Sequence, residues 1–371
     1  MATYHVPRYD YPSQFGPLDE LLPRIGDLLL NGDYVLGRPV RDFEESLAGY
    51  LGVPHVVGTN SGTDALVLAL DALGIGPGDE VITVSNTFHA TAMAIVRVGA
   101  LPVLVDCRPD DYLIDLSQVD QVVTERTKAL VIVHMFGRAV DMDAAVRTAE
   151  RHGLLLVEDC AQAIGALSCG TPVGSRSSAG CWSFAPSKNL AAAGDAGAIS
   201  VSDPVLAANL RRLRHFGQVK QNYHEVIGYN SRLDSVQALV LSHKLAQVDG
   251  WNLRRREIAG IYRSSLRDLP VSFQDEGSPG EHVYHLFQMR SEHRDGLINF
   301  LQEHGTDAVV RYPLPLHLQE AFQDLNYAPG DFPVSEDLAR TTLCLPLHPS
   351  LRQDQIDSVT DAVHEFFSEM S

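Results

Sequence analysis

The stretch Leu154-Leu155-Leu156-Val157-Glu158-Asp159, followed by CAQA at 160–163, decides the fold, because its apolar run has the length of a buried strand and ends in two acids. Similar short runs rich in Val, Ile and Leu lie at 81–84, 102–106 and 129–134. Longer amphipathic segments separate the runs, at 63–73, 90–98 and 142–152. Strands that alternate with helices in this way predict an α/β fold with a largely parallel sheet.

The chain changes its pattern after residue 233. Residues 234–269 have a helical pattern that no strand-like run interrupts. Beyond a loop rich in Gly, Pro and Ser come an apolar run and two helical segments, at 283–289, 294–304 and 353–367. We therefore expect a large domain over 1–250, with an N-terminal arm at 1–17 lying over a surface, and a small α+β domain over 251–371.

Length and composition restrict the function. The 371 residues are 45% hydrophobic and 20% charged, which is typical of a globular protein of roughly two or three domains. A formal net charge of −18 disfavours nucleic acids and anionic membranes as partners. The five cysteines are scattered, which predicts a cytoplasmic protein without disulfides. No apolar run is long enough to span a membrane, so no membrane span is expected. The sequence has no HxxxH or HExxH motif, so no metal site is expected.

The segment GTNSGTDAL at 58–66 runs from a strand into an apolar helix. Ser61 is placed to cap that helix, and Gly62 permits a close backbone approach. Free amides at such a helix start bind phosphate groups. For this segment taken alone, an ordinary capped helix is the favoured interpretation.

Two further segments carry reactive side chains. Asp159 stands at the carboxyl end of its strand, where open α/β sheets bind ligands, and alternation points Glu158 to the opposite face; an acidic helix cap is the alternative. Lys188, in GCWSFAPSKNL at 180–190, lies between an aromatic strand and a loop of small residues. A lysine recessed there beside other cations has a lowered pKa and can form an imine with a carbonyl, whereas a surface lysine remains solvated.

Together these segments supply what pyridoxal 5′-phosphate requires of a protein: a phosphate cup, a lysine for its aldehyde and a carboxylate for its ring nitrogen. The cofactor also needs a flat side chain against its ring. Phe88, which follows a predicted strand, is placed to provide one, although Phe88 alone would be interpreted as a core residue.

The motifs resemble those of the DegT-type sugar aminotransferases, fold-type I pyridoxal phosphate enzymes that install amino groups on keto sugars attached to nucleotides. The resemblance begins at GDYVLG and runs almost to the C-terminus. Its blocks are SGTDAL at 61–66, EDCAQA at 158–163, SFAPSKNL at 183–190, GDAGAI at 194–199 and GYNSRLDSVQAL at 228–239. It implies a large domain with a mostly parallel seven-stranded sheet flanked by helices, and a small C-terminal α+β domain.

The resemblance also implies roles for individual residues. Lys188 would form the imine with the cofactor aldehyde, and Asp159 would pair with the pyridinium nitrogen. Gln162 would contact the ring hydroxyl, and Phe88 would stack on the ring.

Four further residues are matched to the cofactor phosphate. Gly62, Thr63 and the hydroxyl of Ser183 would hold it, and Asn230 would reach it from the neighbouring subunit. The resemblance therefore implies a homodimer with its active site at the interface.

The implied reaction is transamination from L-glutamate to a nucleotide-linked keto sugar, in deoxyaminosugar biosynthesis. Relatives with His in place of the lysine perform dehydration, so Lys188 favours transamination. The segment RRLRHFG at 211–217, with Lys220 and Tyr223 after it, offers charge and an aromatic face to a nucleotide diphosphate, although a solvated basic helix face is the alternative.

This stretch is similar to the branch acting on 3-keto-6-deoxyhexoses linked to thymidine diphosphate, and therefore favours 3-amination. Tyr312 and His317, in RYPLPLH, are expected to border the sugar unless they belong to a packed turn. Arg254, Arg255 and Arg256 are expected to form a solvated helix face.

Three alternatives remain open: amination at C4 of a sugar, amination of a cyclitol, and a non-catalytic regulator that binds pyridoxal phosphate. The intact Lys188, Asp159, Ser183 and Asn230 argue against the regulator, because a protein without catalysis would be free to lose the lysine.

Overall fold

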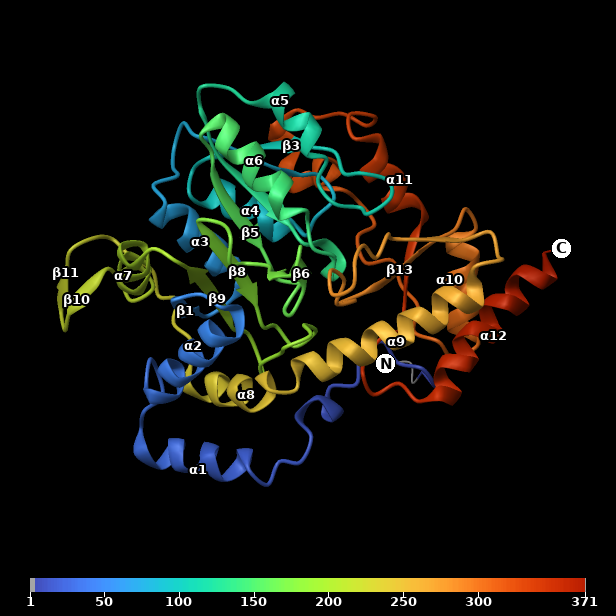
Figure 1. Cartoon of the computed structure of the whole chain (residues 1–371), viewed down its shortest axis with the longest axis horizontal. Helices are drawn as coiled ribbons and strands as arrows, with labels where there is room; N and C mark the ends of the chain where they lie inside the picture. The colour runs from blue at the N-terminus through green and yellow to red at the C-terminus, as the bar shows by residue number, and fades with distance from the viewer. Residues whose placement is uncertain (1–3, 371) are drawn as a thin grey trace.

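A seven-stranded sheet forms the centre of the larger part of the molecule in a computed structural model that describes residues 4–370 (Figure 1). The strand order is β1-β9-β8-β5-β4-β2-β3. The strands are β1 His55–Thr59, β2 Glu80–Val84, β3 Leu101–Val105, β4 Thr127–Val133, β5 Leu155–Asp159, β8 Ala179–Ser183 and β9 Gly197–Val201. Strands β8, β5, β4, β2 and β3 pair in parallel, and only β9 runs against its neighbours. The mostly parallel seven-stranded sheet is thus confirmed.

Helices flank this sheet and follow its strands. They are α2 Arg38–Leu51, α3 Gly62–Ala72, α4 His89–Arg97, α5 Val119–Val122, α6 Met142–His152, α7 Pro204–Leu213 and α8 Ser235–Leu245, with short 3₁₀ turns at Leu116–Gln118 and Met135–Gly137. Local chemistry fixes their ends. In α6, the Asp141 carboxylate accepts a hydrogen bond from the Ala144 amide at 3.0 Å, and Gly153 ends the helix with a φ of 64°.

The long helix α9, Val248–Leu266, leads from α8 into a smaller C-terminal part (Figure 1). There an antiparallel sheet of β12 Ser272–Phe273, β13 Phe287–Arg290 and β14 Thr342–Leu345 is accompanied by α10 Arg294–Glu303, α11 Pro333–Thr341 and α12 Gln353–Glu369. The 3₁₀ turns Leu316–Leu318 and Glu320–Leu325 complete it. The predicted domain boundary at 250 falls within α9 and stays a prediction.

Two expectations differ from the structure in this part of the chain. The apolar run at 283–289 becomes a strand only from Phe287, because Val283 donates its amide to the Gly137 carbonyl at 2.9 Å and so reaches back to the large sheet's loops. The solvated face predicted for three arginines of α9 is wrong for Arg255. Its side chain is buried and donates to the carbonyls of Tyr284 and Leu347.

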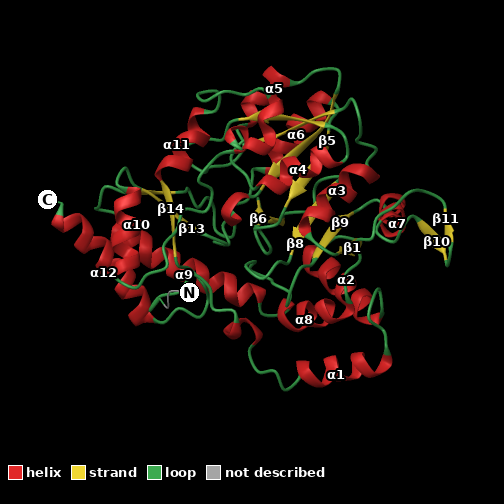
Figure 2. Cartoon of the chain, turned by 180° about the vertical axis from the view of Figure 1, so that it is seen from behind, coloured by secondary structure: helices red, strands yellow, loops and turns green. Residues whose placement is uncertain are grey.

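The N-terminal arm can be followed from residue 4, and its first described residues lie over the small part of the molecule; residues 1–3 lie outside the described range. Val6 is buried and forms a bridge with Thr306. After a 3₁₀ turn at Pro12–Phe15 the chain forms α1, Leu21–Asn31, which lies along α8 (Figure 2).

Two small hairpins complete the fold. One pairs β6 Leu167–Ser168 with β7 Thr171–Pro172, and the other pairs β10 Gln218–Lys220 with β11 Tyr223–His224. The β10–β11 hairpin projects at the edge of the molecule beyond α7 in both views (Figures 1 and 2). Within residues 4–370, none of the helices is both long enough and apolar enough to cross a lipid bilayer.

Candidate active site

A cavity of about 290 Å³ opens at the carboxyl ends of the parallel strands, where ligands bind in open α/β sheets. Its walls are Ser61, Gly62, Thr63, Leu66, Thr87, Phe88, Ala90, Val133, Asp159, Ala161, Gln162, Ser183, Ala185, Ser187, Lys188, Asp195, Arg311 and Tyr312. Seven of the eight residues expected to bind the cofactor meet here, together with Tyr312. Asn230 does not.

One end of the cavity is the start of α3. The Ser61 hydroxyl accepts a hydrogen bond from the Asp64 amide at 3.1 Å, and the first amides of a helix have no partner within it. A Cβ at Gly62 would lie 2.5 Å from the Cβ of Ser183, so only glycine lets these segments approach so closely. The glycine, the free amides and the Ser183 hydroxyl form a cup that fits a phosphate group.

Asp159 lies at the centre of the cavity wall, at the end of β5. Its Oδ2 accepts a hydrogen bond from the Thr91 hydroxyl at 2.9 Å, and its Oδ1 accepts one from the Ala161 amide at 3.1 Å. Burial raises the pKa of Asp159, while these two hydrogen bonds and the charge of Lys188 oppose the rise. A cation in the cavity, such as a protonated ring nitrogen, would hold this carboxylate ionised.

Glu158 does not line the cavity, in agreement with the strand alternation that places it opposite Asp159. Its Oε2 lies 3.0 Å from His134 Nε2 and accepts a hydrogen bond from the Gly174 amide at 2.7 Å. The Val140 amide donates to His134 Nδ1, so Nε2 carries the proton and donates to Glu158. Burial raises the pKa of Glu158, but the bonds from His134 and Gly174 bring it below its ordinary value. The pair ties β5 to the end of β4.

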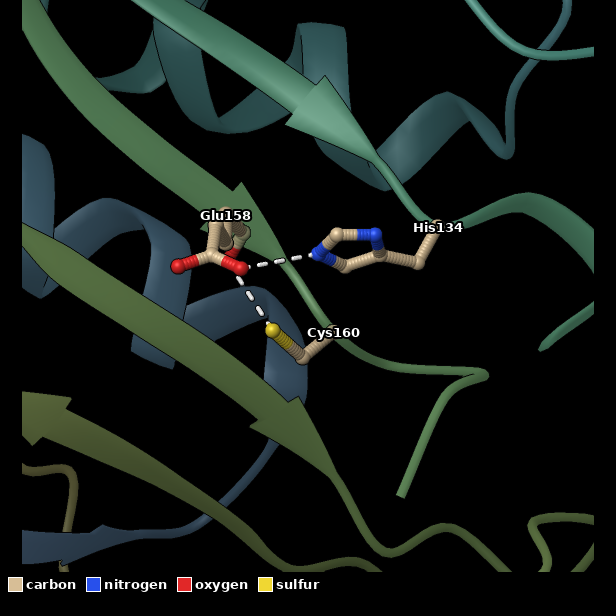
Figure 3. A group of neighbouring side chains, drawn as sticks. All are labelled: His134, Glu158 and Cys160. Atoms are coloured by element: carbon tan, nitrogen blue, oxygen red, sulfur yellow. Dashed lines mark hydrogen bonds and ion pairs between the residues drawn. The ribbon is translucent and has the colours of Figure 1, made fainter. Parts of the chain in front are cut away.

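Cys160 completes the cluster drawn in Figure 3, and its thiol lies 3.8 Å from the Glu158 carbonyl oxygen. Both ring nitrogens of His134 are engaged in hydrogen bonds, so the cluster fixes the direction of β5 and thereby of Asp159.

Lys188 lies in a tight turn after β8, with its side chain partly buried in the cavity. Burial lowers the pKa of Lys188 to about 8; Asp159 opposes that change and Arg311 adds to it. The neighbouring Asn189 anchors the turn, because its amide donates to Asn252 Oδ1 at 2.9 Å and to the Val283 carbonyl at 3.1 Å. The result is a fixed amine that is partly neutral near neutral pH.

Gln162 and Tyr312 join the two parts of the molecule across the cavity. Gln162 Oε1 accepts a hydrogen bond from the Phe136 amide at 2.7 Å, and its Nε2 donates to the Tyr312 hydroxyl at 2.9 Å. Burial raises the pKa of Tyr312 to about 12, so the phenol keeps its proton. Phe88, at the start of α4, is 47% exposed, which leaves its ring available to a planar ligand.

Three residues of this site, Thr87, Thr91 and Arg311, were not predicted from the sequence. Thr87 and Thr91 lie four residues apart around the start of α4, so both hydroxyls face the same side, 3.1 Å from each other. That spacing after a strand was the available signal for Thr91, which contacts Asp159. The signal for Arg311 was its place directly before Tyr312 in RYPLPLH.

The remaining predicted residues lie outside the cavity of their own chain. Lys220 and Tyr223 are exposed on the β10–β11 hairpin, with the Lys220 amine 5.2 Å from the Tyr223 ring centre. Asn230 is exposed and forms a bridge with His215. His317 is buried, with its Nε2 3.0 Å from Glu336 Oε1, in the manner of the packed-turn alternative.

The basic segment before the hairpin carries less free charge than its sequence indicates. Arg214 is buried, forms an ion pair with Glu44 and donates to the Gly58 carbonyl at 2.7 Å. Arg212 pairs with Glu225 at 2.7 Å. Two of the arginines expected to attract a diphosphate are therefore engaged within the chain.

Comparison with known proteins identifies the family. The model of the DegT/DnrJ/EryC1/StrS aminotransferase family matches residues 19–364. A dTDP-3-amino-3,4,6-trideoxy-α-D-glucose transaminase of Streptomyces venezuelae is 43% identical, over 98% of this chain and 97% of its own. A pleiotropic regulatory protein of Geobacillus stearothermophilus is 42% identical, over 98% of this chain and 99% of its own.

A solved structure is similar over the same extent. The crystal structure of S. venezuelae DesV in complex with a ketimine intermediate has a TM-score of 0.96 and 42% identity, and the match covers 98% of this chain and 99% of that one. The chain therefore belongs to the DegT/DnrJ/EryC1/StrS aminotransferase family and is an enzyme of the aminotransferase class.

Proposed function

We propose that the protein transfers the amino group of L-glutamate to the C3 ketone of a nucleotide-linked 6-deoxyhexose, with thymidine diphosphate as the favoured nucleotide. The products are 2-oxoglutarate and a 3-amino sugar for deoxyaminosugar biosynthesis. The observation that carries the proposal is the convergence of the Lys188 amine, the Asp159 carboxylate and the amides of α3 on one cavity. The similarity to the 3-amino sugar transaminase of S. venezuelae supports the choice of substrate.

Pyridoxal 5′-phosphate is the cofactor, and when bound it supplies an aldehyde and an electron-withdrawing ring. The amides of Gly62 and Thr63, with the Ser183 hydroxyl, would hold its phosphate. Asp159 would hold the proton on the ring nitrogen, and Phe88 would lie against the ring.

Lys188 is the residue that moves protons. With a pKa of about 8, part of its amine is neutral near neutral pH, so it can take a proton from the substrate Cα and deliver it again as an acid. Thr91 and the Ala161 amide orient the Asp159 carboxylate. Gln162 donates to the Tyr312 oxygen, which leaves the phenol proton of Tyr312 free to be donated to another acceptor.

A homodimer completes the site in this proposal. Asn230, Lys220 and Tyr223 are exposed and lie away from the cavity of their own chain, so they are free to serve the cavity of a second copy. Large apolar side chains are also exposed on α1 and beside the hairpin, at Leu22, Leu29, Leu30 and Ile227. Apolar surface of this kind indicates a protein interface. The five cysteines are free thiols, which favours the cytoplasm.

The experiment that tests the proposal is an absorption spectrum of the purified protein with its cofactor. The yellow absorbance should bleach on addition of L-glutamate and return on addition of the nucleotide-linked keto sugar. A spectrum that L-glutamate leaves unchanged would contradict the proposed donor, and failure to bind pyridoxal phosphate at all would contradict the whole proposal. Trials with a 4-keto sugar and a keto-inositol distinguish the alternative acceptors, and a non-catalytic regulator would bind the cofactor without bleaching.

A further inference from the structure

Helix α11 of the C-terminal part is capped by a side chain of the large part. Its own N-cap residue, Phe332, has no polar side chain for the free amides of the first turn. Asp106, which directly follows β3, accepts hydrogen bonds from them. Its Oδ2 accepts one from the Val334 amide at 2.8 Å, and its Oδ1 accepts two from the amide and hydroxyl of Ser335, at 2.9 Å and 2.6 Å. The start of α11 is therefore held at the end of a strand of the large sheet.

The surroundings of Asp106 make this a firm attachment. Asp106 is 4% exposed and Ser335 is fully buried, so water does not compete for their hydrogen bonds. A carboxylate at a helix start is stabilised by the free amides and by the helix dipole together. The hydroxyl of Ser335 also lies 2.6 Å from the hydroxyl of Ser85, which directly follows β2. Two neighbouring strands thus share the attachment of α11.

The chain just before α11 has two further attachments to the same strands. The Leu316 amide donates to the Ser85 carbonyl at 3.0 Å, and the Tyr327 hydroxyl accepts a hydrogen bond from the Leu104 amide at 3.0 Å. Because β3 is the last strand of the sheet, this amide has no strand partner on its outer side. An apolar cluster fills the space between them, and its buried members are Ala92, Leu104, Leu316, Phe322 and Phe332.

We call residues 313–332 the wall segment, because they form one side of a second hollow of about 390 Å³. The other side is the start of α4, with Phe88 and His89. In Figure 1 the orange-red chain leading to α11 lies near β3, apart from α10 and α12. Although the wall segment follows α10 in the sequence, it is attached to the large sheet. Both sides of the second hollow are therefore fixed to the large part.

The second hollow adjoins the cavity that contains Lys188, and the two share Thr87, Phe88, Arg311 and Tyr312. The cavity, at about 290 Å³, is near the lower limit of about 300 Å³ for a drug-sized ligand. A cofactor and a nucleotide-linked sugar together need more room than that. The second hollow supplies the additional room beside the reacting amine.

We infer that Asp106 is a positioning residue for the sugar substrate: it holds the wall segment against the large sheet, so that the second hollow is formed before the substrate arrives. This inference rests on the proposed function, which brings a nucleotide-linked keto sugar to the cavity. A preformed wall removes the entropic cost of ordering a loop on binding. If the wall segment is in place for only part of the time, the dissociation constant of the substrate rises by the inverse of that fraction.

The test begins with Asp106→Asn, which keeps the shape of the side chain but removes the charge at the start of α11. The KM for the nucleotide-linked keto sugar should rise about tenfold, as expected if the wall segment is in place a tenth of the time. The half-reaction with L-glutamate should change little, because Tyr312 keeps its own hydrogen bond to Gln162.

Two further variants release the same wall segment. Ser335→Ala removes the hydroxyl between Asp106 and Ser85, and should also raise this KM. Combined with Asp106→Asn, it should raise KM by less than the product of the two single effects, because both changes act on one attachment. Tyr327→Phe removes only the acceptor for the Leu104 amide, so it should fold normally and raise KM by a smaller factor.

Hydrogen exchange of the cofactor-free protein provides a readout without activity. In Asp106→Asn the amides of the wall segment should exchange faster than in the wild type, whereas those of α10 and α12 should be unchanged. Asp141→Ala is the matched control, because Asp141 caps its own helix, α6. It should lower the midpoint of thermal unfolding while the KM for the keto sugar and exchange in the wall segment stay as in the wild type.

The outcomes separate this inference from the proposed function. Unchanged exchange in the wall segment, or faster exchange there with an unchanged KM, overturns the role of Asp106 and leaves the proposed function intact. Faster exchange that extends to α10 and α12, with both half-reactions slowed equally, shows general destabilisation and also overturns it. A wild type that converts neither L-glutamate nor a keto sugar overturns the proposed function, and the substrate role of Asp106 with it. Even then, the exchange measurement decides whether Asp106 holds the wall segment, since it needs no substrate.

Discussion

The cavity at the ends of β5 and β8 and the β10–β11 hairpin contrast in how far one chain completes them. In the cavity, Asp159 accepts two hydrogen bonds from its own chain, and Lys188 is fixed by the turn that Asn189 anchors. On the hairpin, Lys220 and Tyr223 are exposed and stack on each other. Burial in the cavity lowers the pKa of Lys188 and raises the pKa of Asp159.

This difference indicates a division of tasks. The chain arranges by itself the groups that would act on the cofactor under the proposed function, because they lie at strand ends and helix starts that the sheet places together. Under the proposed function, the side chains predicted for the sugar nucleotide depend on a second copy. Changes in the cavity should therefore affect the chemistry, and changes on the hairpin should affect only the binding of the second substrate.

The largest effect is expected from Lys188→Ala. Loss of the general base alone costs about 10²- to 10⁴-fold, and loss of the covalent attachment to the cofactor adds to it, so turnover should fall below detection. The fold should persist, because a desolvated amine with a lowered pKa contributes nothing favourable to stability. Steady-state kinetics and thermal unfolding check both points. Lys128→Ala, at an exposed position of β4, is the matched control, and normal turnover in Lys188→Ala would refute the assignment.

Asp159→Asn should have the next largest effect. A neutral amide cannot stabilise a pyridinium proton, and removal of one such electrostatic contact costs about 10²- to 10³-fold in kcat. The amide keeps the shape of the side chain, so the free energy of unfolding should change little. Single-turnover rates with L-glutamate measure the effect, and unaltered kinetics would remove Asp159 from the mechanism.

Much of this arrangement could be predicted from the sequence. The strand that ends at Asp159, the helix capped by Ser61 and the turn at Lys188 depend on local patterns, namely apolar runs, a capping residue and small residues. Those patterns act within a few residues, so the four predicted strands of the large sheet agree with the structure to within two residues and the helix at 142–152 agrees fully.

The side chains whose surroundings could not be predicted from the sequence have a common physical reason. Whether an arginine is free or paired depends on contacts between distant segments, such as Arg214 with Glu44 and Arg255 with the Tyr284 carbonyl. No local pattern reveals these partners, so Arg214 and Arg255 were expected in solvent and Arg311 was overlooked. The surroundings of His317 show the same limit, since Glu336 and Phe332 enclose it from another segment.

An effect of intermediate size is expected from pH. The pKa of Lys188 is lowered to about 8, so the neutral fraction of its amine should increase about tenfold between pH 7 and pH 9 and then level off. Arg311→Gln removes a cation and should move the midpoint to higher pH, whereas Asp159→Asn removes an anion and should move it to lower pH. Labelling of Lys188 in the cofactor-free protein with trinitrobenzenesulfonate, followed by mass spectrometry, measures the midpoint. A midpoint near 10.5 would contradict the burial of the amine.

The smallest effect on the chain itself is expected on the hairpin. Lys220→Ala with Tyr223→Ala should leave the free energy of unfolding within about 0.5 kcal/mol of the wild type, because both side chains are exposed. The half-reaction with L-glutamate should also be unchanged. The KM for the nucleotide sugar should rise about tenfold, the cost of one charge-assisted hydrogen bond.

Mixing variants then shows which cavity the hairpin serves. In a heterodimer of Lys188→Ala with the hairpin double variant, one cavity has an intact lysine and faces the intact hairpin of the other chain. Random exchange makes about half of the dimers mixed, each with one complete site, so about a quarter of the activity with normal KM should appear. If the hairpin served its own chain, the intact lysine and the intact hairpin would never meet in one site, and mixing would restore nothing. That result would leave the cavity as described and remove the second copy from substrate binding.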